Sequence, residues 1–164
     1  MNRKYAITPA RAVDTDAFLE IVRRRQQWLA DQRIDQWKGY ESFFPREYFE
    51  KARQEGRFYT ARDENDRVCA AIVLLAADPY WQGYEHPSAL YLHNLASRTD
   101  APGAGRALLD FCTQYARERG FAVLRLDCAR DNPALNEYYA RQGFAAVGQC
   151  ADGDYRGTLR EKTL

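Results

Sequence analysis

The chain has 164 residues, of which 46% are hydrophobic and 13% aromatic. This length suits one folded domain with a substantial core, and the composition argues against the disordered and membrane-spanning classes. The formal net charge is only +1, which removes the electrostatic case for non-specific nucleic-acid binding. We therefore expect a single domain over residues 1–164, with neither nucleic acid nor a membrane among its partners.

The N-terminal residues MNRKYAITPA lack an apolar signal core, so we expect a cytoplasmic location. The four cysteines are widely spaced, without a CxxC pair or a nearby histidine cluster. In a reducing compartment this pattern favours small buried apolar residues over disulfides or a zinc site. We accordingly expect no bound metal and burial of the four thiols, which belong to Cys69, Cys112, Cys128 and Cys150.

A short strand over residues 5–11 and then a helix are the first predicted elements. The polar acceptors of residues 14–16 suit a helix N-cap. Helical spacing then relates the apolar side chains of Phe18, Ile21, Val22 and Leu29. The adjacent arginines 23–25 could grip a phosphate, but such a run is typical of a solvated helix face, which we favour.

The segment between Trp28 and Phe49 is irregular and rich in aromatic residues. Within it Pro45 suits the start of a second helix, which Gly56 would end. The aromatic side chains either fill a core beneath a long loop or line a binding pocket, and both alternatives remain open.

Two antiparallel strands are predicted over residues 57–62 and 68–75, joined by the polar turn 63–67. The second strand is almost continuously apolar, so we expect it near the centre of a sheet, covered on both faces. Residues 78–87 follow as a loop, because they combine proline and glycine with several aromatic side chains.

The most informative motif of the sequence lies in residues 90–119. An apolar strand over 90–97 leads into the turn Asp-Ala-Pro-Gly-Ala-Gly of residues 100–105, and a helix follows from Arg106 to a stop at Gly120. The first N–H groups of such a helix have no intrahelical partner and carry partial positive charge, so they can bind phosphate. A plain packing turn is the alternative.

Two familiar phosphate loops do not fit this turn. A Rossmann fingerprint requires a third glycine where Leu108 stands, and a P-loop requires Lys-Ser/Thr after Gly105, where the chain has Arg-Ala. Downstream we expect a strand over 121–128, a helix that starts at Pro133 and runs to Arg141, and a hairpin. The hairpin pairs residues 144–149 with 155–163 around the turn 152–154.

The combined pattern is Gly-x-Gly-x-x-Leu-Leu from Gly103, then a strand, then Asn-x-x-Leu-x-x-x-Tyr-x-x-x-Gly-Phe from Asn132. It resembles the GNAT superfamily of acetyl-coenzyme A-dependent N-acetyltransferases, most strongly over residues 90–148. The resemblance implies an α/β fold with a mixed, mostly antiparallel central sheet flanked by helices. It also implies direct acetyl transfer, in a ternary complex, from acetyl-coenzyme A to a primary amine of a small molecule or peptide.

For the coenzyme, the resemblance implies that loop amides hold the pyrophosphate and that the end of the 90–97 strand binds the pantetheine arm, where this strand splays from its parallel neighbour. The loop departs from the family pattern Gln/Arg-x-x-Gly-x-Gly/Ala because its first position is Asp100; Arg98 or Arg106 would then supply the missing charge. Asn132 would contact the pantetheine or cap a helix. The candidate coenzyme residues are Leu95, Ala96, Ser97, Asp100, Ala101, Gly103, Ala104, Gly105, Arg106 and Asn132.

For catalysis, Tyr139 stands four residues before Gly143, where the family carries its general-acid tyrosine. A phenol is protonated at neutral pH and can donate to a departing thiolate; a core-capping role is the alternative. Its neighbour Tyr138 should point elsewhere. His93, on the strand beside the expected acetyl site, is the candidate base, with a structural histidine or a water chain as alternatives.

For the acceptor, the resemblance implies a pocket walled by the segment between the first two helices. The aromatic stretches 28–49 and 80–84 favour a compact substrate with an apolar body. The candidate residues are Trp28, Trp37, Tyr80, Trp81 and Tyr91. Two other functions stay open: a non-catalytic coenzyme A-binding sensor or regulatory module, and a structural domain that binds nothing. We expect a monomer or a homodimer.

Overall fold

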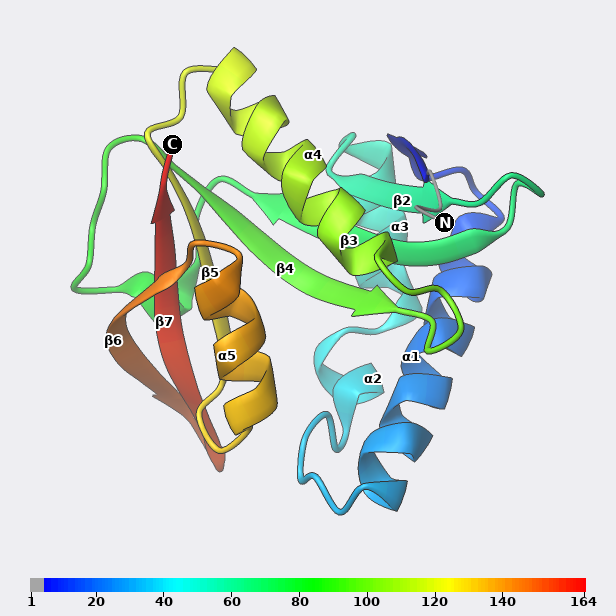
Figure 1. The fold of residues 1–164 in the computed structure, drawn as a ribbon, viewed down its shortest axis with the longest axis horizontal. Helices are drawn as coiled ribbons and strands as arrows, with labels where there is room; N and C mark the ends of the chain where they lie inside the picture. The colour runs from blue at the N-terminus through cyan, green and yellow to red at the C-terminus, as the bar shows by residue number, and fades with distance from the viewer. Residues whose placement is uncertain (1–4) are drawn as a thin grey trace. The chain divides into compact units, whose positions relative to one another are not determined.

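The computed structural model describes residues 5–164, and it has the mixed α/β fold that the sequence predicts (Figure 1). Seven strands form one sheet in the order β1-β2-β3-β4-β5-β7-β6. Strands β4 and β5 pair in parallel, whereas β1–β2, β2–β3, β5–β7 and β6–β7 are antiparallel. The elements are β1 (Ala6–Pro9), α1 (Asp14–Asp31), α2 (Tyr40–Phe43), α3 (Arg46–Gln54), β2 (Phe58–Arg62), β3 (Val68–Leu75), the 3₁₀ turn η1 (Pro79–Trp81), β4 (Ala89–Ser97), α4 (Ala104–Glu118), β5 (Val123–Ala129), α5 (Pro133–Arg141), β6 (Ala145–Asp152) and β7 (Tyr155–Thr163).

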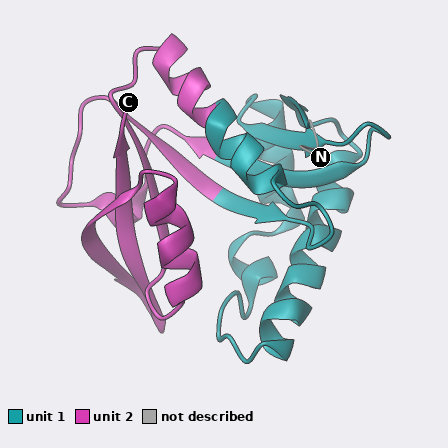
Figure 2. Ribbon diagram, viewed as in Figure 1, with its two compact units in different colours: residues 1–73, 94–111 teal, residues 74–93, 112–164 magenta. Residues whose placement is uncertain are grey.

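The chain divides into two compact units, shown in different colours in Figure 2. Unit 1 comprises residues 1–73 and 94–111, and unit 2 comprises residues 74–93 and 112–164. Strands β3 and β4 and helix α4 each begin in one unit and end in the other.

In unit 1, strand β2 packs helices on its two faces because consecutive strand side chains point to opposite sides. Phe58 meets Phe18 of α1 and Phe49 of α3, with ring centroids 5.5 and 5.6 Å away. The next residue, Tyr59, packs on the other face against Phe111 of α4, with a centroid distance of 4.9 Å. All three phenylalanines of the first cluster are fully buried, so this aromatic cluster is the core of unit 1.

Helix α1 does not begin with the expected polar N-cap. The N-cap residue is Val13, which makes no capping hydrogen bond, and Asp14 is the first helical residue. The Asp14 carboxylate is buried, accepts a hydrogen bond from the Arg11 N–H at 2.6 Å, and pairs with Arg62 of β2. A buried carboxylate needs a charged partner, and the pairing with β2 therefore decides where this side chain points.

In unit 2, helix α5 and the segment before β4 cover opposite faces of the sheet. On one face, Tyr139 of α5 packs against Phe144, with ring centroids 6.0 Å apart. On the other, buried Trp81 of η1 meets Tyr91 of β4 at a centroid distance of 5.9 Å. The guanidinium of Arg125 lies 4.3 Å from the Trp81 ring centroid and pairs with Glu161.

Several predicted boundaries shift by a few residues. Helix α4 starts at Ala104 rather than Arg106, because Gly103 takes a left-handed conformation (φ +86°) that completes the turn earlier. Strand β5 starts at Val123, and β6 extends to Asp152. The short elements α2 and η1 lie inside segments expected to be irregular, where single helical turns leave no periodic signal.

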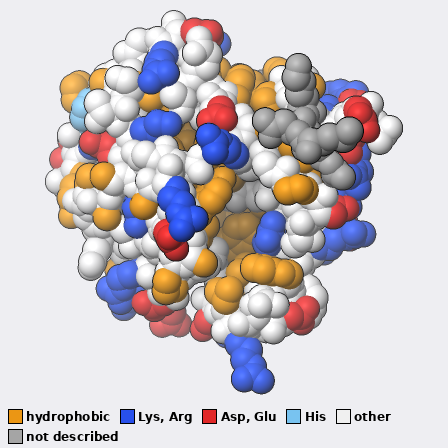
Figure 3. Space-filling view, in the orientation of Figure 1, with side chains coloured by type: hydrophobic (Ala, Val, Ile, Leu, Met, Phe, Trp, Pro, Cys, Tyr) orange, Lys and Arg blue, Asp and Glu red, His pale blue; other side chains and the backbone are white. Residues whose placement is uncertain are grey.

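No helix within residues 5–164 is long and apolar enough to cross a bilayer. Basic and acidic side chains are interspersed over the face seen in Figure 3. Several are paired on one element: Glu20, for example, bonds both Arg23 and Arg24 of α1. Of the four cysteines, Cys69, Cys112 and Cys128 are buried as expected, whereas Cys150 is half-buried.

Candidate active site

The parallel pairing of β4 with β5 stops before either strand ends. Three register pairs exist, and the last joins Tyr91 to Arg125. The next residues on that face are His93 and Asp127, which the same register would place opposite each other. Their backbones are no longer paired, so the two side chains lie where the sheet starts to open.

Asp78 is held against His93 by its position at the start of η1. One carboxylate oxygen, Oδ1, accepts the Tyr80 N–H at 2.9 Å and so caps the turn. The other, Oδ2, lies 2.5 Å from Nε2 of His93. Because the Asp78 side chain is only 1% exposed and that of His93 13%, this is a largely desolvated carboxylate–imidazole pair.

The pKa of His93 is raised above its usual value. Burial lowers it, but the hydrogen bond and charge of Asp78, together with the charge of Asp127, outweigh that effect. An imidazole with a raised pKa is a stronger base, and a carboxylate on one nitrogen fixes its orientation. The pair has the composition of a general base and the residue that positions it.

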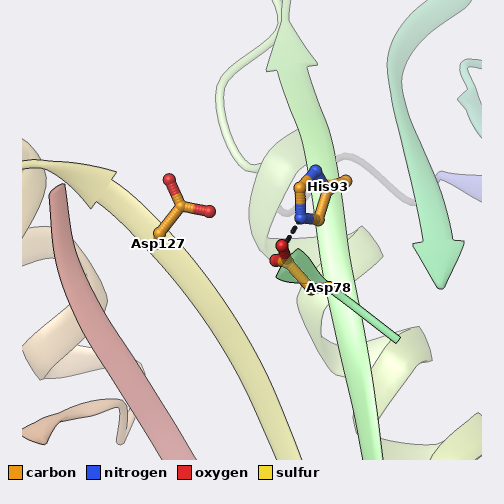
Figure 4. Close-up of side chains that lie close together, drawn as sticks. All are labelled: Asp78, His93 and Asp127. Atoms are coloured by element: carbon orange, nitrogen blue, oxygen red, sulfur yellow. Dashed lines mark hydrogen bonds and ion pairs between the residues drawn. The ribbon is translucent and has the colours of Figure 1, made fainter. Parts of the chain in front are cut away.

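Asp127 brings a second carboxylate to His93, as Figure 4 shows. Burial raises the pKa of its carboxyl, while the Tyr155 hydroxyl and the charge of His93 act in the opposite direction. The Tyr155 hydroxyl donates to Oδ2 of Asp127 at 2.6 Å. Single ligand atoms of Asp78, His93 and Asp127 all lie within 4.8 Å of one another, so these three residues could also hold a divalent cation.

Tyr139 lies on the opposite side of the unit 2 sheet, in α5. It is buried, and its hydroxyl makes no hydrogen bond to another residue of the described chain. Burial raises the pKa of this phenol, so it stays protonated. Its neighbour Tyr138 packs edge-on against it, with ring centroids 5.3 Å apart. The Tyr139 hydroxyl is therefore a proton donor without a partner among residues 5–164.

The glycine-bearing turn belongs to unit 1. Within the described chain, no hydrogen bond is made by the N–H groups of Gly103, Gly105 and Arg106, at the start of α4. Ala101 and Ala104 are buried beneath the turn, and the Tyr5 hydroxyl bonds the Pro102 carbonyl at 3.0 Å. The turn thus presents unpaired amides on a supported backbone, as an anion site requires.

Asp100 is neutralised by neighbouring arginines rather than left to repel an anion. Arg98 donates to both of its oxygens, at 2.8 and 2.9 Å, and Arg67 approaches to 3.4 Å. The Arg98 hydrogen bond is the main cause that lowers the pKa of Asp100. Arg106, the other candidate for the missing charge, is exposed and lies 3.7 Å from Asp110.

Arg25 departs from the predicted solvated helix face. It is half-buried and donates to the Ser97 carbonyl at 2.6 Å and to the Ser97 hydroxyl at 3.3 Å. Arg23 and Arg24 remain on the surface with Glu20. Arg25 therefore anchors the end of β4, because only one residue of an arginine run can face a given neighbour on a helix.

Strand β4 is distorted just before its candidate coenzyme residues. Asn94 adopts φ +57°, a left-handed conformation that is uncommon in a strand. Its side chain is held by the hydroxyls of Tyr40 and Tyr48, at 2.9 and 3.1 Å. Of the residues that follow, Ala96 is buried, while Leu95 and Ser97 are half-buried. Asn132 caps α5, its side chain accepting the Leu135 N–H at 3.1 Å.

The five candidate acceptor residues separate into different environments. Trp81 and Tyr91 are buried in unit 2, where Arg125 packs against both rings. Tyr80 stays partly exposed beside the Asp78–His93 pair. In unit 1, Trp28 is exposed beneath the Arg25 guanidinium, and the Trp37 ring packs against a tyrosine of α2 at 5.2 Å. Within this set, the Tyr80 N–H donates directly to Asp78 of the Asp78–His93 pair.

Three polar residues of this site were missed in the sequence: Asp78, Asp127 and Tyr155. Asp78 precedes a proline, a helix-start signal, but nothing local points to its histidine partner 15 residues away. Asp127 lies near the end of the apolar strand β5, and Tyr155 follows a turn 28 residues later. The strand register alone brings these groups together.

These features define a class of protein. The model of the acetyltransferase (GNAT) family matches residues 22–144, most of the chain, so the chain belongs to this family and is an acyltransferase. Among individual proteins, it is 27% identical over 153 residues to the uncharacterized N-acetyltransferase YesJ of Bacillus subtilis. That match covers 88% of this chain and 84% of the relative.

Solved structures of low sequence identity share the fold. A GNAT-family acetyltransferase of Streptococcus agalactiae superposes with a TM-score of 0.79 at 14% identity, over 99% of each chain. The PaiA N-acetyltransferase of Thermoplasma acidophilum, solved in complex with coenzyme A, has a TM-score of 0.75 at 17% identity. That match covers 98% of this chain and 99% of the other. The predicted family and fold class are both confirmed.

Proposed function

We propose that this acetyltransferase moves an acetyl group from acetyl-coenzyme A to a primary amine of a small molecule or peptide, by direct transfer in a ternary complex. The observation that carries the proposal is the 2.5 Å contact between His93 and Asp78 at the point where β4 and β5 separate. An acceptor amine arrives protonated at neutral pH and must lose a proton before it attacks. A buried, carboxylate-supported imidazole suits that step.

In the proposed reaction one C–N bond replaces one C–S bond, and the protons move through His93 and Tyr139. His93 takes a proton from the acceptor ammonium, and the neutral nitrogen attacks the thioester carbonyl. The new C–N bond forms as the C–S bond breaks, and the departing thiolate takes a proton from Tyr139, which it would reach from the other face of the sheet where β4 and β5 are no longer paired. The attacking nitrogen gives up its second proton, which water carries to the Tyr139 phenolate, and His93 releases the proton that it took to solvent, which leaves a neutral amide and free coenzyme A.

For the coenzyme, we propose that the unpaired amides at the start of α4 bind the pyrophosphate and that the backbone of Leu95, Ala96 and Ser97 binds the pantetheine arm. The left-handed Gly103 supports the first assignment, because it lets the turn present its amides without a side chain in front. We further propose that both units act as one acetyltransferase domain, since the matched residues 22–144 draw on each of them. We propose a cytoplasmic location.

A non-catalytic coenzyme A-binding module is the second candidate, favoured by the replacement of the family's first loop residue by Asp100. Two measurements separate the candidates. Acetyl-coenzyme A should raise the melting temperature, because a ligand that binds only the native state stabilises it. Release of free thiol with a panel of amines should then report turnover. A melting shift without thiol release would support the sensor, and no shift would overturn both.

A further inference from the structure

A row of carboxylates and phenols leads away from His93 across one face of the unit 2 sheet. The Tyr155 hydroxyl donates to Asp127 at 2.6 Å, and the Tyr80 hydroxyl donates to Asp152 at 3.1 Å. The rings of Tyr80 and Tyr155 stack between these two hydrogen bonds, with centroids 5.8 Å apart and planes 29° from parallel. The order along the row is Asp127, Tyr155, Tyr80, Asp152.

Strand register explains the length of this row. Asp127 pairs with Leu159 of β7, and Asp152 pairs with Tyr155 of the same strand. Leu159 and Tyr155 are four residues apart, so they share a face and are separated by about 13 Å along an extended strand. The two carboxylates thus mark the ends of this row of four side chains, called the path below, and the two phenol rings lie between them.

The charges along the path are predominantly negative. Its inner end holds Asp78 and Asp127 around His93, and its outer end holds Asp152. Side-chain alternation sends Arg160 of β7 to the other face, where it bonds the Phe144 carbonyl at 2.8 Å. Arg125 shares the face of the path, but its charge is matched by Glu161 at 2.7 Å.

We propose that the acceptor is a linear amine with a second ammonium group, its reacting nitrogen beside Asp127 and His93 and its distal ammonium at Asp152. This inference rests on the proposed acetyl transfer. Carboxylates form charge-assisted hydrogen bonds with ammonium groups, and aromatic faces attract cations and pack against methylene chains. Burial removes water from the Asp127 carboxylate. An ammonium that binds there supplies hydrogen bonds that water would otherwise make.

Kinetics with three matched acceptors test this assignment on the full-length chain with acetyl-coenzyme A: diamino-octane, octylamine and amino-octanoic acid. They share a chain length and differ at the distal end, which is cationic, apolar or anionic. We expect kcat/KM for diamino-octane to exceed that for octylamine at least about tenfold, as a hydrogen bond between charged groups allows. Amino-octanoic acid should be the poorest acceptor, because its carboxylate meets that of Asp152.

The variant Asp152→Asn removes the outer charge and keeps the shape of the side chain. It should bring the diamino-octane to octylamine ratio of kcat/KM close to one. The matched control is Asp154→Asn, two residues further along the hairpin turn, which should leave the ratio as in the unmodified chain. A ratio that Asp152→Asn does not change overturns the distal assignment.

The test distinguishes failure of the inference from failure of the proposed function. Equal kcat/KM for octylamine and diamino-octane, with both acetylated, overturns the second-ammonium assignment and leaves acetyl transfer standing. Absence of turnover with every amine, despite a melting shift with acetyl-coenzyme A, overturns the proposed function, and the acceptor assignment falls with it.

Discussion

At the scale of single residues, His93 depends on the carboxylate beside it. Burial alone would lower the pKa of this imidazole, and Asp78 reverses that effect through its hydrogen bond and charge. A base acts in its deprotonated form, so activity should rise as pH increases through the pKa of His93. We therefore expect the acid limb of the pH profile above the ordinary histidine value of 6.5.

The first prediction concerns Asp78→Asn. The amide keeps the size of the side chain but removes the charge, so burial dominates and the pKa of His93 falls. The acid limb of kcat/KM against pH should move to lower pH. Near neutral pH, kcat/KM should drop at least about tenfold, because the imidazole loses its orientation and basicity. In the control Asp154→Asn the acid limb should stay in place. An acid limb that also stays in place in Asp78→Asn would contradict the pairing of Asp78 with His93.

The second prediction concerns Tyr139→Phe, which removes the hydroxyl and keeps the ring that packs on Phe144. A proton donated to the leaving thiolate matters only as the C–S bond breaks, so kcat should fall at least about tenfold while the coenzyme Kd changes little. Turnover and calorimetry on the same preparation check both values. The control is Tyr138→Phe. Loss of activity in the control alone would place the acid at residue 138.

At the scale of elements, the start of α4 is the candidate phosphate site because its amides are unpaired within the described chain. The third prediction is that Gly105→Glu abolishes acetyl-coenzyme A binding in calorimetry, since it adds bulk and a like charge where the anion would lie. Gln114→Glu adds the same charge on the exposed side of α4 and should bind normally. Wild-type affinity in Gly105→Glu would refute the phosphate assignment.

The ion pair between Asp14 of α1 and Arg62 of β2 connects two elements of unit 1. Their side chains are only 2% and 6% exposed. The fourth prediction is that Asp14→Ala lowers the free energy of unfolding by about 3 kcal/mol, because it leaves the buried Arg62 with the exposed Asp66 as its remaining ion-pair partner among residues 5–164. Asp16→Ala breaks an exposed pair with Arg46 and should cost no more than about 1 kcal/mol. Urea denaturation of both variants measures the difference.

At the scale of the whole molecule, the activity should not require a metal ion. Asp78, His93 and Asp127 could hold a divalent cation, yet a bound cation would break the hydrogen bond from His93 to Asp78 and make the imidazole a weaker base. The fifth prediction is that dialysis against a chelator leaves kcat unchanged and that added Zn²⁺ inhibits. Loss of activity on chelation, restored by a divalent cation, would assign these residues to a metal site instead.

Much of the architecture could be predicted from the sequence, because apolar periodicity, proline and glycine act on the local backbone. The strand, turn and helix around Gly103 and the helix that starts at Pro133 were predicted from such signals, and the structure confirms these elements. The boundary of α4 was misjudged by two residues, because the backbone conformation of Gly103 rather than its presence decides where the turn ends. The family pattern also singled out Tyr139, whereas His93 became the candidate base through its place on the strand beside the expected acetyl site.

The amino-acid sequence by itself determined the family and the order of the main strands and helices, and it supplied candidate residues for acid, base and anion-binding chemistry, because these depend on neighbours in the chain. Tertiary structure decided which of those residues meet. Asp78 reaches His93 across 15 residues and Tyr155 reaches Asp127 across 28, and Arg25 rather than Arg24 bonds Ser97. Strand register and helix rotation set these contacts, and both depend on how buried faces pack rather than on any local signal.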